Sequence, residues 1–475
     1  MIFNSFQFLW LFPLIFIVYW GAGRLSSSSG KGKRIAQYVL LAISYALYAQ
    51  WSLPYTLILF GITLCTYSFA LLIERCKAYG RKKYIIWIGA ILTILPLVVF
   101  KYYNFITQAG ASALAWIGID RPSPGLNWVV PLGLSFYSFQ ALGYLWDVYY
   151  RKYKAERNFP DYMLFVAFFP QILCGPISKA EELLPQIKRE ARFDYARGVA
   201  GLRYLLWGMF LKVVLADRLG IYVDTVYSDP LHYSGSSNIL ASIFYSFQIY
   251  GDFAGYSFMA LGVAKLLGYD IIKNFNRPYF ATSVSQFWKR WNISLTRWLT
   301  TYIYIPQGGS RKGKLRTYWN ILLTFFVSGI WHGANWTFLF WGLIHGMTQC
   351  MEKFLGLNKP VGKRWLIAPR ILMSFIIVNV AWVFFRLPSI EDGFTVIRHF
   401  FSFGKPYLDM LSIAHSAFAL FVVIVVDFLF EYRNRAVHSF IGRHKVIRWA
   451  AYLFLTLSIV LFGVLDSGQF IYVSF

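Results

Sequence analysis

The stretch that decides the fold is residues 328–338, SGIWHGANWTF. Its histidine, His332, lies in a run of 35 residues, 317–351, that contains no Asp, Glu, Lys or Arg. As one helix this run would extend about 52 Å, too far for a single crossing of a hydrocarbon core about 30 Å thick, while two full crossings would be short. Basic loops flank it at 311–316 and 353–364. If both loops are cytoplasmic, the run enters the membrane and returns, with His332 at the far turn of a tight hairpin or deep in a re-entrant pair.

The composition of the whole chain agrees with a membrane protein. Of 475 residues, 57% are hydrophobic, 20% aromatic and only 14% charged, against about a quarter charged in soluble domains. The net charge is +25. Nucleic-acid binding is not expected from this charge, because the Lys and Arg residues flank apolar spans, where they contact anionic lipid and set topology. An anionic substrate at one face would also suit the charge.

The apolar runs predict an all-α polytopic protein with about eleven transmembrane helices plus re-entrant segments. Basic loops at 24–34 and 75–83 enclose a 39-residue segment, 35–73, that fits two passes. The first span would then be retained, with its N-terminus outside. Further runs occur at 84–100, 102–118, 126–149, 160–178, 199–222, 239–268, 319–351, 366–386, 411–430 and 449–466. A re-entrant break is expected in FFPQILCGPIS (168–178), at Pro170 and Gly175-Pro176.

A buried ionisable residue in a membrane segment indicates function by default, and His332 is therefore the first candidate. The alternative is a neutral histidine hydrogen-bonded between helices. The glycines of GIWHG and GLIHG (342–346) are spaced four apart, which is typical of close helix packing. On one continuous helix His345 would lie about 220° around from His332, so the two are not expected to share a face or a metal. The four cysteines show no metal-ligand spacing either.

The preceding stretch, SQFWKRWNISLTRWLTTYIYIPQGGSRKGK (285–314), has amphipathic character. Its aromatic and apolar residues recur at helical spacing: Trp288, Trp291, Leu295 and Trp298. The bases beside them, Arg290 among them, are consistent with an interfacial helix or with attraction of a phosphate-bearing donor. The Gly-rich end lacks the spacing of a P-loop. Asp252, alone in a long apolar span, is expected to pair with a base.

The motifs together resemble the membrane-bound O-acyltransferase (MBOAT) family, and most closely its bacterial alginate O-acetyltransferase branch. The similar stretches lie at 130–150 (VPLGLSFYSFQALGYLWDVYY), 168–187, 250–269, 287–309 and 329–346 (GIWHGANWTFLFWGLIHG), with the ending FIYVSF. The resemblance implies a single membrane domain over residues 1–475 with its core at about 126–386. It also implies a helical bundle around a central funnel, with His332 matching the family's catalytic histidine.

The implied activity is transfer of an acyl group, acetyl by default, from a cytoplasmic thioester donor such as acetyl-CoA to a hydroxyl of an exported polysaccharide. No bound cofactor or metal is expected. The implied partners are membrane lipid, the donor, the polysaccharide acceptor and an extracytoplasmic acyltransferase protein. The implied location is the bacterial cytoplasmic (inner) membrane.

The chain departs from the branch pattern at four places. Asn292 stands in WNISLT where the pattern has a histidine, and Thr300 and Thr301 stand where it has Arg-Asp. Gln307 replaces a leucine, and Phe258 replaces an aspartate. Because an asparagine cannot titrate near neutral pH, a mechanism that needs two histidines is not supported.

The residues favour His332 as a general base toward the acceptor hydroxyl. Asn292, Asn335 or tryptophan N–H groups would then donate to the developing oxyanion. The remaining substrate or channel candidates are Trp331, Trp336, Trp288, Trp291, Arg290 and Asp252. Other hypotheses stay open: teichoic-acid D-alanyl transfer, peptidoglycan O-acyl transfer, a transporter that uses the same broken helices, or a non-catalytic scaffold for an acyltransferase.

Overall fold

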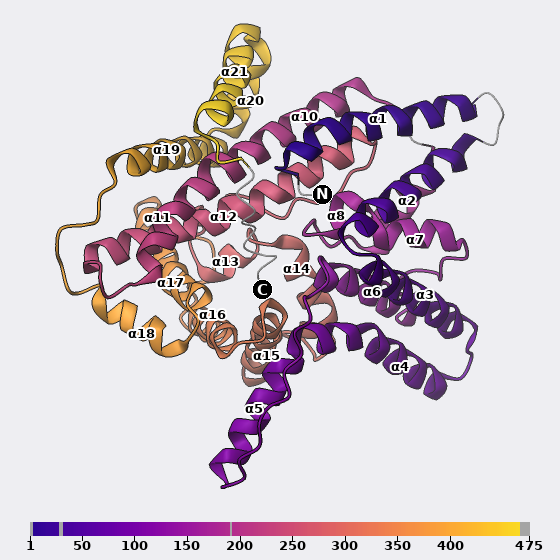
Figure 1. Cartoon of the computed structure of the whole chain (residues 1–475), viewed down its shortest axis with the longest axis horizontal. Coiled ribbons are helices and arrows are strands. Elements are labelled where there is room, and N and C mark those ends of the chain that lie inside the picture. Colours follow the sequence, from indigo (N-terminus) through magenta and orange to yellow (C-terminus); the bar gives the residue numbers. More distant parts are fainter. Residues whose placement is uncertain (1–2, 28–31, 191, 466–475) are drawn as a thin grey trace. The chain divides into compact units, whose positions relative to one another are not determined.

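The computed structural model describes residues 3–27, 32–190 and 192–465, and within these ranges the chain is helical and contains no β-strand (Figure 1). The all-α fold expected from the sequence is confirmed. The ending FIYVSF and the last residue of the run 449–466 lie outside the described residues, as does part of the first basic loop.

Seven helical stretches in the described part of the chain are long and apolar enough to cross a membrane. They are Phe6–Arg24, Leu53–Arg75, Gly80–Trp116, Tyr195–Ser228, Arg364–Arg386, Met410–Tyr432 and Lys445–Phe462. The protein is therefore a multi-pass membrane protein.

The described residues contain seven candidate membrane spans and not the eleven expected, and the causes can be identified. The runs 84–100 and 102–118 are one continuous stretch: α4 (Tyr79–Leu97), the π-helix η1 (Val98–Tyr102) and α5 (Tyr103–Trp116). The runs 126–149 and 160–178 form helices too short to span: α6 (Leu134–Tyr149), α7 (Phe159–Ala167) and α8 (Phe169–Ile172).

The described chain divides into two compact units that alternate along the sequence. The first comprises residues 1–3, 7–202 and 260–272, and the second comprises 4–6, 203–259 and 273–475. The family core expected at about 126–386 contributes to both units, and the single domain expected over 1–475 stays a prediction.

In the first unit, α1 (Phe6–Ser27), α2 (Gly32–Trp51) and α3 (Leu53–Arg75) are followed by α4 and α6, which pack against α3. The break expected at Pro170 is confirmed, since α7 ends at Ala167 and α8 is a single turn. A close approach fixes it: a Cβ on Gly133, whose φ is +71°, would lie 2.0 Å from the carbonyl oxygen of Ile172. The short helix α9 (Ala180–Ile187) follows. That the broken segment 168–178 is re-entrant in a membrane stays a prediction.

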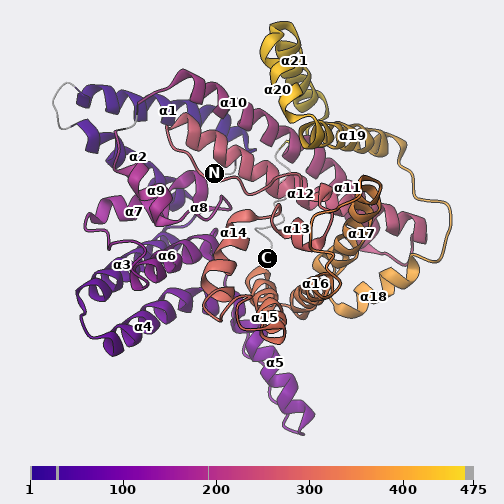
Figure 2. The ribbon, with the colours of Figure 1, turned by 180° about the vertical axis from the view of Figure 1, so that it is seen from behind.

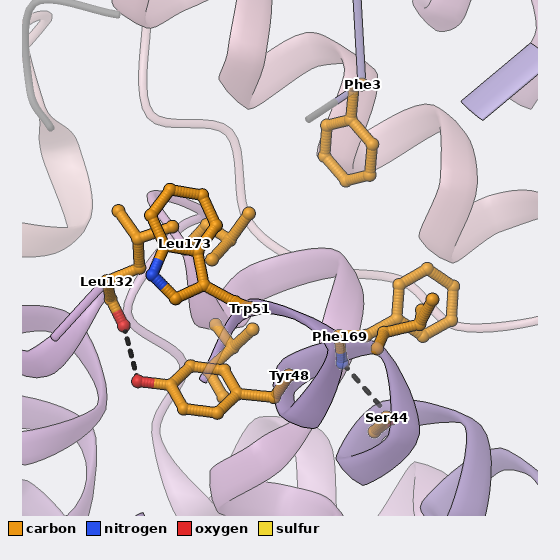
Figure 3. A pocket seen from close by; sticks show the side chains of 9 residues that line it. Phe3, Ser44, Tyr48, Trp51, Leu132, Phe169 and Leu173 are labelled. Carbon is orange, nitrogen blue, oxygen red and sulfur yellow. Dashed lines mark hydrogen bonds between the residues drawn. The ribbon is translucent and has the colours of Figure 1, made fainter. Parts of the chain in front are cut away.

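Beside this break lies a small apolar pocket (Figure 3). It is lined by Phe3, Ser44, Leu47, Tyr48, Trp51, Leu132, Phe169, Ile172 and Leu173. The Tyr48 hydroxyl donates to the carbonyl of Leu132 at 2.8 Å, and the Phe169 N–H donates to the Ser44 hydroxyl oxygen at 3.4 Å. The Ser44 bond ties the broken segment to α2, and the Tyr48 bond ties α2 to the chain just before α6.

The second unit carries the sequence motifs around His332. Its helices are α11 (Asp217–Ser228), α15 (Lys314–His332), α16 (Trp336–Phe354), α17 (Ile367–Arg386), α18 (Ile390–His399), α19 (Met410–Tyr432), α20 (Asn434–Arg443) and α21 (Lys445–Phe462). The shorter elements are the π-helices η2 (Phe210–Ala216) and η4 (Thr300–Tyr304), the 3-10 turns η3 (Pro278–Phe280) and η5 (Arg364–Leu366), and the helices α13 (Val284–Trp288) and α14 (Ile293–Leu299). Two long helices, α10 (Tyr195–Met209) and α12 (Gly235–Leu266), contribute residues to both units.

Helices α15 and α16 form an antiparallel pair and lie side by side in both views (Figure 1 and Figure 2). The close packing predicted for the glycines is confirmed. A Cβ on Gly329 would lie 2.5 Å from the carbonyl oxygen of Phe338, and one on Gly342 would lie 2.5 Å from that of Phe325. Backbones at this separation admit only glycine.

We expect Gly342→Ala to destabilise the protein by about 1–3 kcal/mol, because the added methyl group meets backbone and not a movable side chain. Thermal unfolding of the detergent-solubilised protein would measure this. Gly61→Ala is the matched control, since it lies inside α3 with nothing within 4 Å of a Cβ. Equal unfolding temperatures for the two variants would contradict the tight contact.

Candidate active site

His332 is the last residue of α15 and lies at the turn of the hairpin. Residues 333–335 make the turn, and Asn335 caps α16 by accepting the Thr337 N–H at 3.1 Å. At the other end of the pair, the Lys353 ammonium donates to the hydroxyl of Ser310, which joins the two flanking basic loops. The far-turn placement is therefore confirmed within the protein.

The two helices together are longer than the charge-free run 317–351, for which two full passes were expected to be short. Helix α15 begins at Lys314 and α16 ends at Phe354, so both extend into the charged flanks. Each has 19 residues and a length of about 28 Å, close to the thickness of a hydrocarbon core. Neither is among the seven apolar stretches, because polar residues lower their mean hydropathy, and their membrane depth stays a prediction.

Aromatic rings surround the His332 imidazole, which is 3% exposed. The centroid of its ring lies 4.9 Å from that of Trp331, 4.9 Å from that of Trp341 and 5.2 Å from that of Phe385. All three pairs are close to perpendicular, at 80°, 81° and 77°. The residue expected to be the base is thus buried among aromatic rings.

His345 belongs to the same cluster, contrary to the reasoning from a continuous helix. The helix stops at His332 and restarts at Trp336, so the 220° offset does not apply. The centroid of the His345 ring lies 4.9 Å from that of Trp341, and the indole of Trp341 therefore contacts both imidazoles. His345 is fully buried, and neither of its ring nitrogens has a hydrogen-bond partner among the described residues. Within those residues no group of three His, Cys, Asp or Glu side chains is arranged to hold a metal.

Trp288 reaches this cluster through a capping interaction that the sequence did not indicate. Its ring centroid lies 5.4 Å from that of Trp341 and 5.1 Å from that of His345. The short helix α13 that carries it is capped by Glu352 of α16, whose carboxylate accepts the N–H groups of Val284 at 2.5 Å and Ser285 at 2.9 Å. A carboxylate at a helix N-terminus accepts hydrogen bonds from the free N–H groups there and interacts favourably with the helix dipole. Glu352 therefore positions Trp288.

The single interfacial helix expected from the spacing of Trp288, Trp291, Leu295 and Trp298 is not formed. The chain turns at 289–292 and divides the segment into α13, α14 and η4. Its apolar residues are nevertheless buried, at 5% for Trp288, 0% for Trp291 and 6% for Trp298. The spacing predicted the buried face correctly but missed the turn, which a residue with positive φ introduces.

That residue is Asn292, with φ +41° and ψ +56°. Asparagine adopts this left-handed conformation more readily than most residues. Asn274 holds the turn, accepting the Ile293 N–H at its carbonyl at 3.0 Å and the Ser294 N–H at its side-chain oxygen at 3.1 Å. The Asn292 side chain is 1% exposed, and among the described residues neither its amide oxygen nor its amide nitrogen has a hydrogen-bond partner. A buried amide without such partners costs free energy, so this position is a candidate part of the site.

Trp291 links this turn to the histidine cluster. The centroid of its ring lies 5.1 Å from that of Trp382, which in turn lies 5.7 Å from that of Trp341 in a stacked arrangement. Trp341, Trp382 and Trp291 are all fully buried. A continuous set of rings therefore runs from the Asn292 turn to His332.

Other predicted site residues have structural partners. The Arg290 guanidinium donates to Glu431 at 2.9 Å, and Arg277 donates to the same carboxylate at 2.8 Å. The Asn335 amide nitrogen donates to the carbonyl of Pro388 at 2.8 Å. Trp331 lies against His332, whereas Trp336 is 58% exposed at the start of α16. Arg290 and Asn335 thus hold neighbouring segments together.

Comparison with known proteins decides the family. A model of the membrane-bound O-acyltransferase family matches residues 154–390. The chain is 33% identical to the probable alginate O-acetylase AlgI of Pseudomonas aeruginosa, over 87% of this chain and 78% of that protein. The chain belongs to the membrane-bound O-acyltransferase family.

Two further relatives are named for other activities. A peptidoglycan O-acetyltransferase of Helicobacter pylori is 32% identical, over 87% of this chain and 81% of the relative. A teichoic acid D-alanyltransferase of Bacillus subtilis is 25% identical, over 68% of this chain and 84% of the relative. The resemblance stated from the motifs is confirmed, and the protein is a membrane O-acyltransferase.

The acyltransferase accommodates its departures from the branch pattern by local contacts. The Thr300 and Thr301 hydroxyls donate to the carbonyls of Thr296 and Arg297, each at 2.7 Å. Phe258 stacks on Tyr204 with ring centroids 5.9 Å apart. The carbonyl of Gln307 accepts from the Asn320 amide at 3.5 Å. None of these contacts involves the cluster around His332.

The pairing expected for Asp252 is confirmed. The Lys212 ammonium donates to Asp252 at 2.6 Å and to Asp217 at 2.7 Å, and all three residues are at most 5% exposed. Lys212 lies in η2, and Asp217 begins α11. The triad joins α12 to the segment before α11, and Asp252 is therefore part of a buried ion-pair network.

We expect Lys212→Met to destabilise the acyltransferase by about 3–5 kcal/mol, because it leaves two buried carboxylates without their cation. Asp252→Asn should cost less, because Lys212 keeps Asp217. Thermal unfolding in detergent ranks the two variants. An unfolding temperature for Lys212→Met equal to or above that of Asp252→Asn would contradict the triad.

Proposed function

We propose that this acyltransferase moves an acetyl group from a cytoplasmic thioester donor such as acetyl-CoA to a hydroxyl of an exported cell-surface polysaccharide. The similarity to an alginate O-acetylase and to a peptidoglycan O-acetyltransferase supports the acyl group and the acceptor class. We place the protein in the bacterial cytoplasmic membrane, with an extracytoplasmic acyltransferase protein as its partner. The observation that carries the proposal is His332, buried at the hairpin turn among aromatic rings.

His332 acts as the general base. One ring nitrogen takes the proton of the acceptor hydroxyl while the hydroxyl oxygen attacks the thioester carbonyl carbon. The C–S bond then breaks, the acetyl ester forms, and the imidazolium returns its proton to the departing thiolate. The histidine ends in its starting state, and no net proton or electron is consumed.

Asn292 stabilises the negative charge that develops on the carbonyl oxygen in this proposed mechanism. Its buried amide, without a partner among the described residues, has N–H groups available for the oxyanion of the tetrahedral intermediate. An amide serves this purpose without titrating, so a histidine at this position is not required. Arg290 and Asn335 are not given this role, because both side chains are already bonded.

The charge distribution of the hairpin suits an anionic donor at one end. Lys314 and Arg316 open α15, and Lys353 lies near the end of α16, so these bases gather at the end opposite His332. Phosphate groups of a donor would interact favourably with them. The thioester would then approach His332 along the hairpin.

D-alanyl transfer is the second candidate, favoured by the similarity to a teichoic acid D-alanyltransferase. The same base and oxyanion donor serve an alanyl thioester equally well. Mass spectrometry of surface glycans from a deletion strain distinguishes the two, since an acetyl ester and a D-alanyl ester differ in mass and in charge.

We expect His332→Ala to abolish acylation, with a loss of at least about 100-fold. The assay is the ester content of surface polysaccharide after the variant replaces the wild-type gene, together with the protein level in the membrane. His232→Ala is the control, because His232 is exposed. A well-expressed His332→Ala variant with normal ester content would falsify the assignment.

Asn292→Gly tests the oxyanion role separately. Glycine suits the positive φ and removes the amide, so stability should be kept or increased while the rate falls about 100- to 1,000-fold. The paired measurements are the initial rate of thiol release from acetyl-CoA in membrane vesicles and thermal unfolding. If the unfolding temperature falls and the rate is unchanged, Asn292 is structural.

A further inference from the structure

General base catalysis places a positive charge on the His332 ring, which lies among aromatic side chains. When the imidazole takes the hydroxyl proton it becomes a cation in a site that is 3% exposed. A buried cation is costly unless neighbouring groups stabilise it. Trp331, Trp341 and Phe385 are among the groups that contact this ring.

The separations of these rings suit attraction between a cation and an aromatic face. In near-perpendicular pairs the edge of one ring meets the face of the other, and aromatic faces carry negative charge density. A cation within about 6 Å of a ring centroid is attracted to the face, and tryptophan attracts it most strongly. All three centroids lie within 5.2 Å of the His332 centroid, at interplanar angles of 77° to 81°.

We propose that Trp341 is a positioning residue whose indole stabilises the imidazolium form of His332, with Trp331 and Phe385 completing an aromatic enclosure. The inference rests on the proposed function and adds to it a reason why a histidine in so apolar a run can accept a proton. The ligand of the enclosure is the protein's own protonated side chain, formed transiently in each turnover.

Trp341 is suited to this role because its position is fixed. It is fully buried, it stacks on Trp382 at 5.7 Å and 23°, and its ring also contacts Trp288 at 5.4 Å. A ring held on several sides needs no rearrangement when the charge appears, and preorganisation of this kind is what makes electrostatic stabilisation effective.

The charged groups near the enclosure are compatible with this assignment. Arg386, which follows Phe385 on α17, donates to Asp224 at 2.8 Å, so its charge is paired. His345 contacts the same indole and would compete for it if protonated. Because His345 is fully buried and lacks a hydrogen-bond partner among the described residues, its neutral form is favoured. The indole is therefore available to His332.

The experiment replaces Trp341 by mono-, di- and trifluorotryptophan through stop-codon suppression in the full-length protein. Fluorine withdraws charge from the ring face and changes ring size little. We expect kcat for thiol release from acetyl-CoA to fall about two- to threefold with each fluorine, while KM for acetyl-CoA and the unfolding temperature stay constant. The same series at Trp382, which stacks on Trp341, is the matched control and should leave kcat unchanged.

The outcomes separate this inference from the proposed function. If His332→Ala is inactive and kcat is independent of fluorination at Trp341, the imidazolium assignment is overturned and the base survives. If fluorination at Trp382 lowers kcat to the same degree, Trp341 acts through packing alone, which also overturns it. If His332→Ala retains activity, the proposed function itself is wrong. Trp341→Phe, which keeps an aromatic face with weaker attraction, should lower kcat without changing KM.

Discussion

The close packing of α15 against α16 is the constraint on which the site depends. Gly329 and Gly342 let the two backbones come so near that a Cβ on either would lie 2.5 Å from a carbonyl oxygen of the facing helix. Only at that separation do His332, at the end of one helix, and His345, on the other, both contact the indole of Trp341. Two small residues therefore determine where an ionisable side chain meets an aromatic ring.

The sequence predicted those features that depend on composition and on chain length. A charge-free run between basic loops placed His332 at a far turn, and glycine spacing predicted the close helix pair. The turn at 289–292 was missed because it depends on one residue with positive φ, which leaves no periodic signal. His345 was set aside because the offset was calculated along a helix that in fact ends at His332. A Gly-Ala-Asn turn after the histidine was the available sign of that break.

Long-range hydrogen bonds account for contacts of predicted site residues that the sequence did not indicate. Arg290 donates to Glu431, and Asn335 donates to the carbonyl of Pro388. Such pairings join segments 141 and 53 residues apart in the sequence, which no local pattern reports. Glu352 shows the converse case. It lies next to Lys353 and suggests a surface ion pair, yet it caps α13 and positions Trp288.

The departure at Asn292 is best understood from what each residue type contributes at a buried, left-handed position. A histidine there would bring a second titratable group, whose charge depends on pH near neutrality. Asparagine accepts the same backbone geometry and offers N–H donors whose state does not depend on pH. In the proposed mechanism the tasks are divided: His332 takes the proton, Asn292 donates to the oxyanion, and the indole of Trp341 stabilises the imidazolium. That mechanism needs one titrating histidine, because the surroundings of its ring, and not a second base, stabilise the charged form.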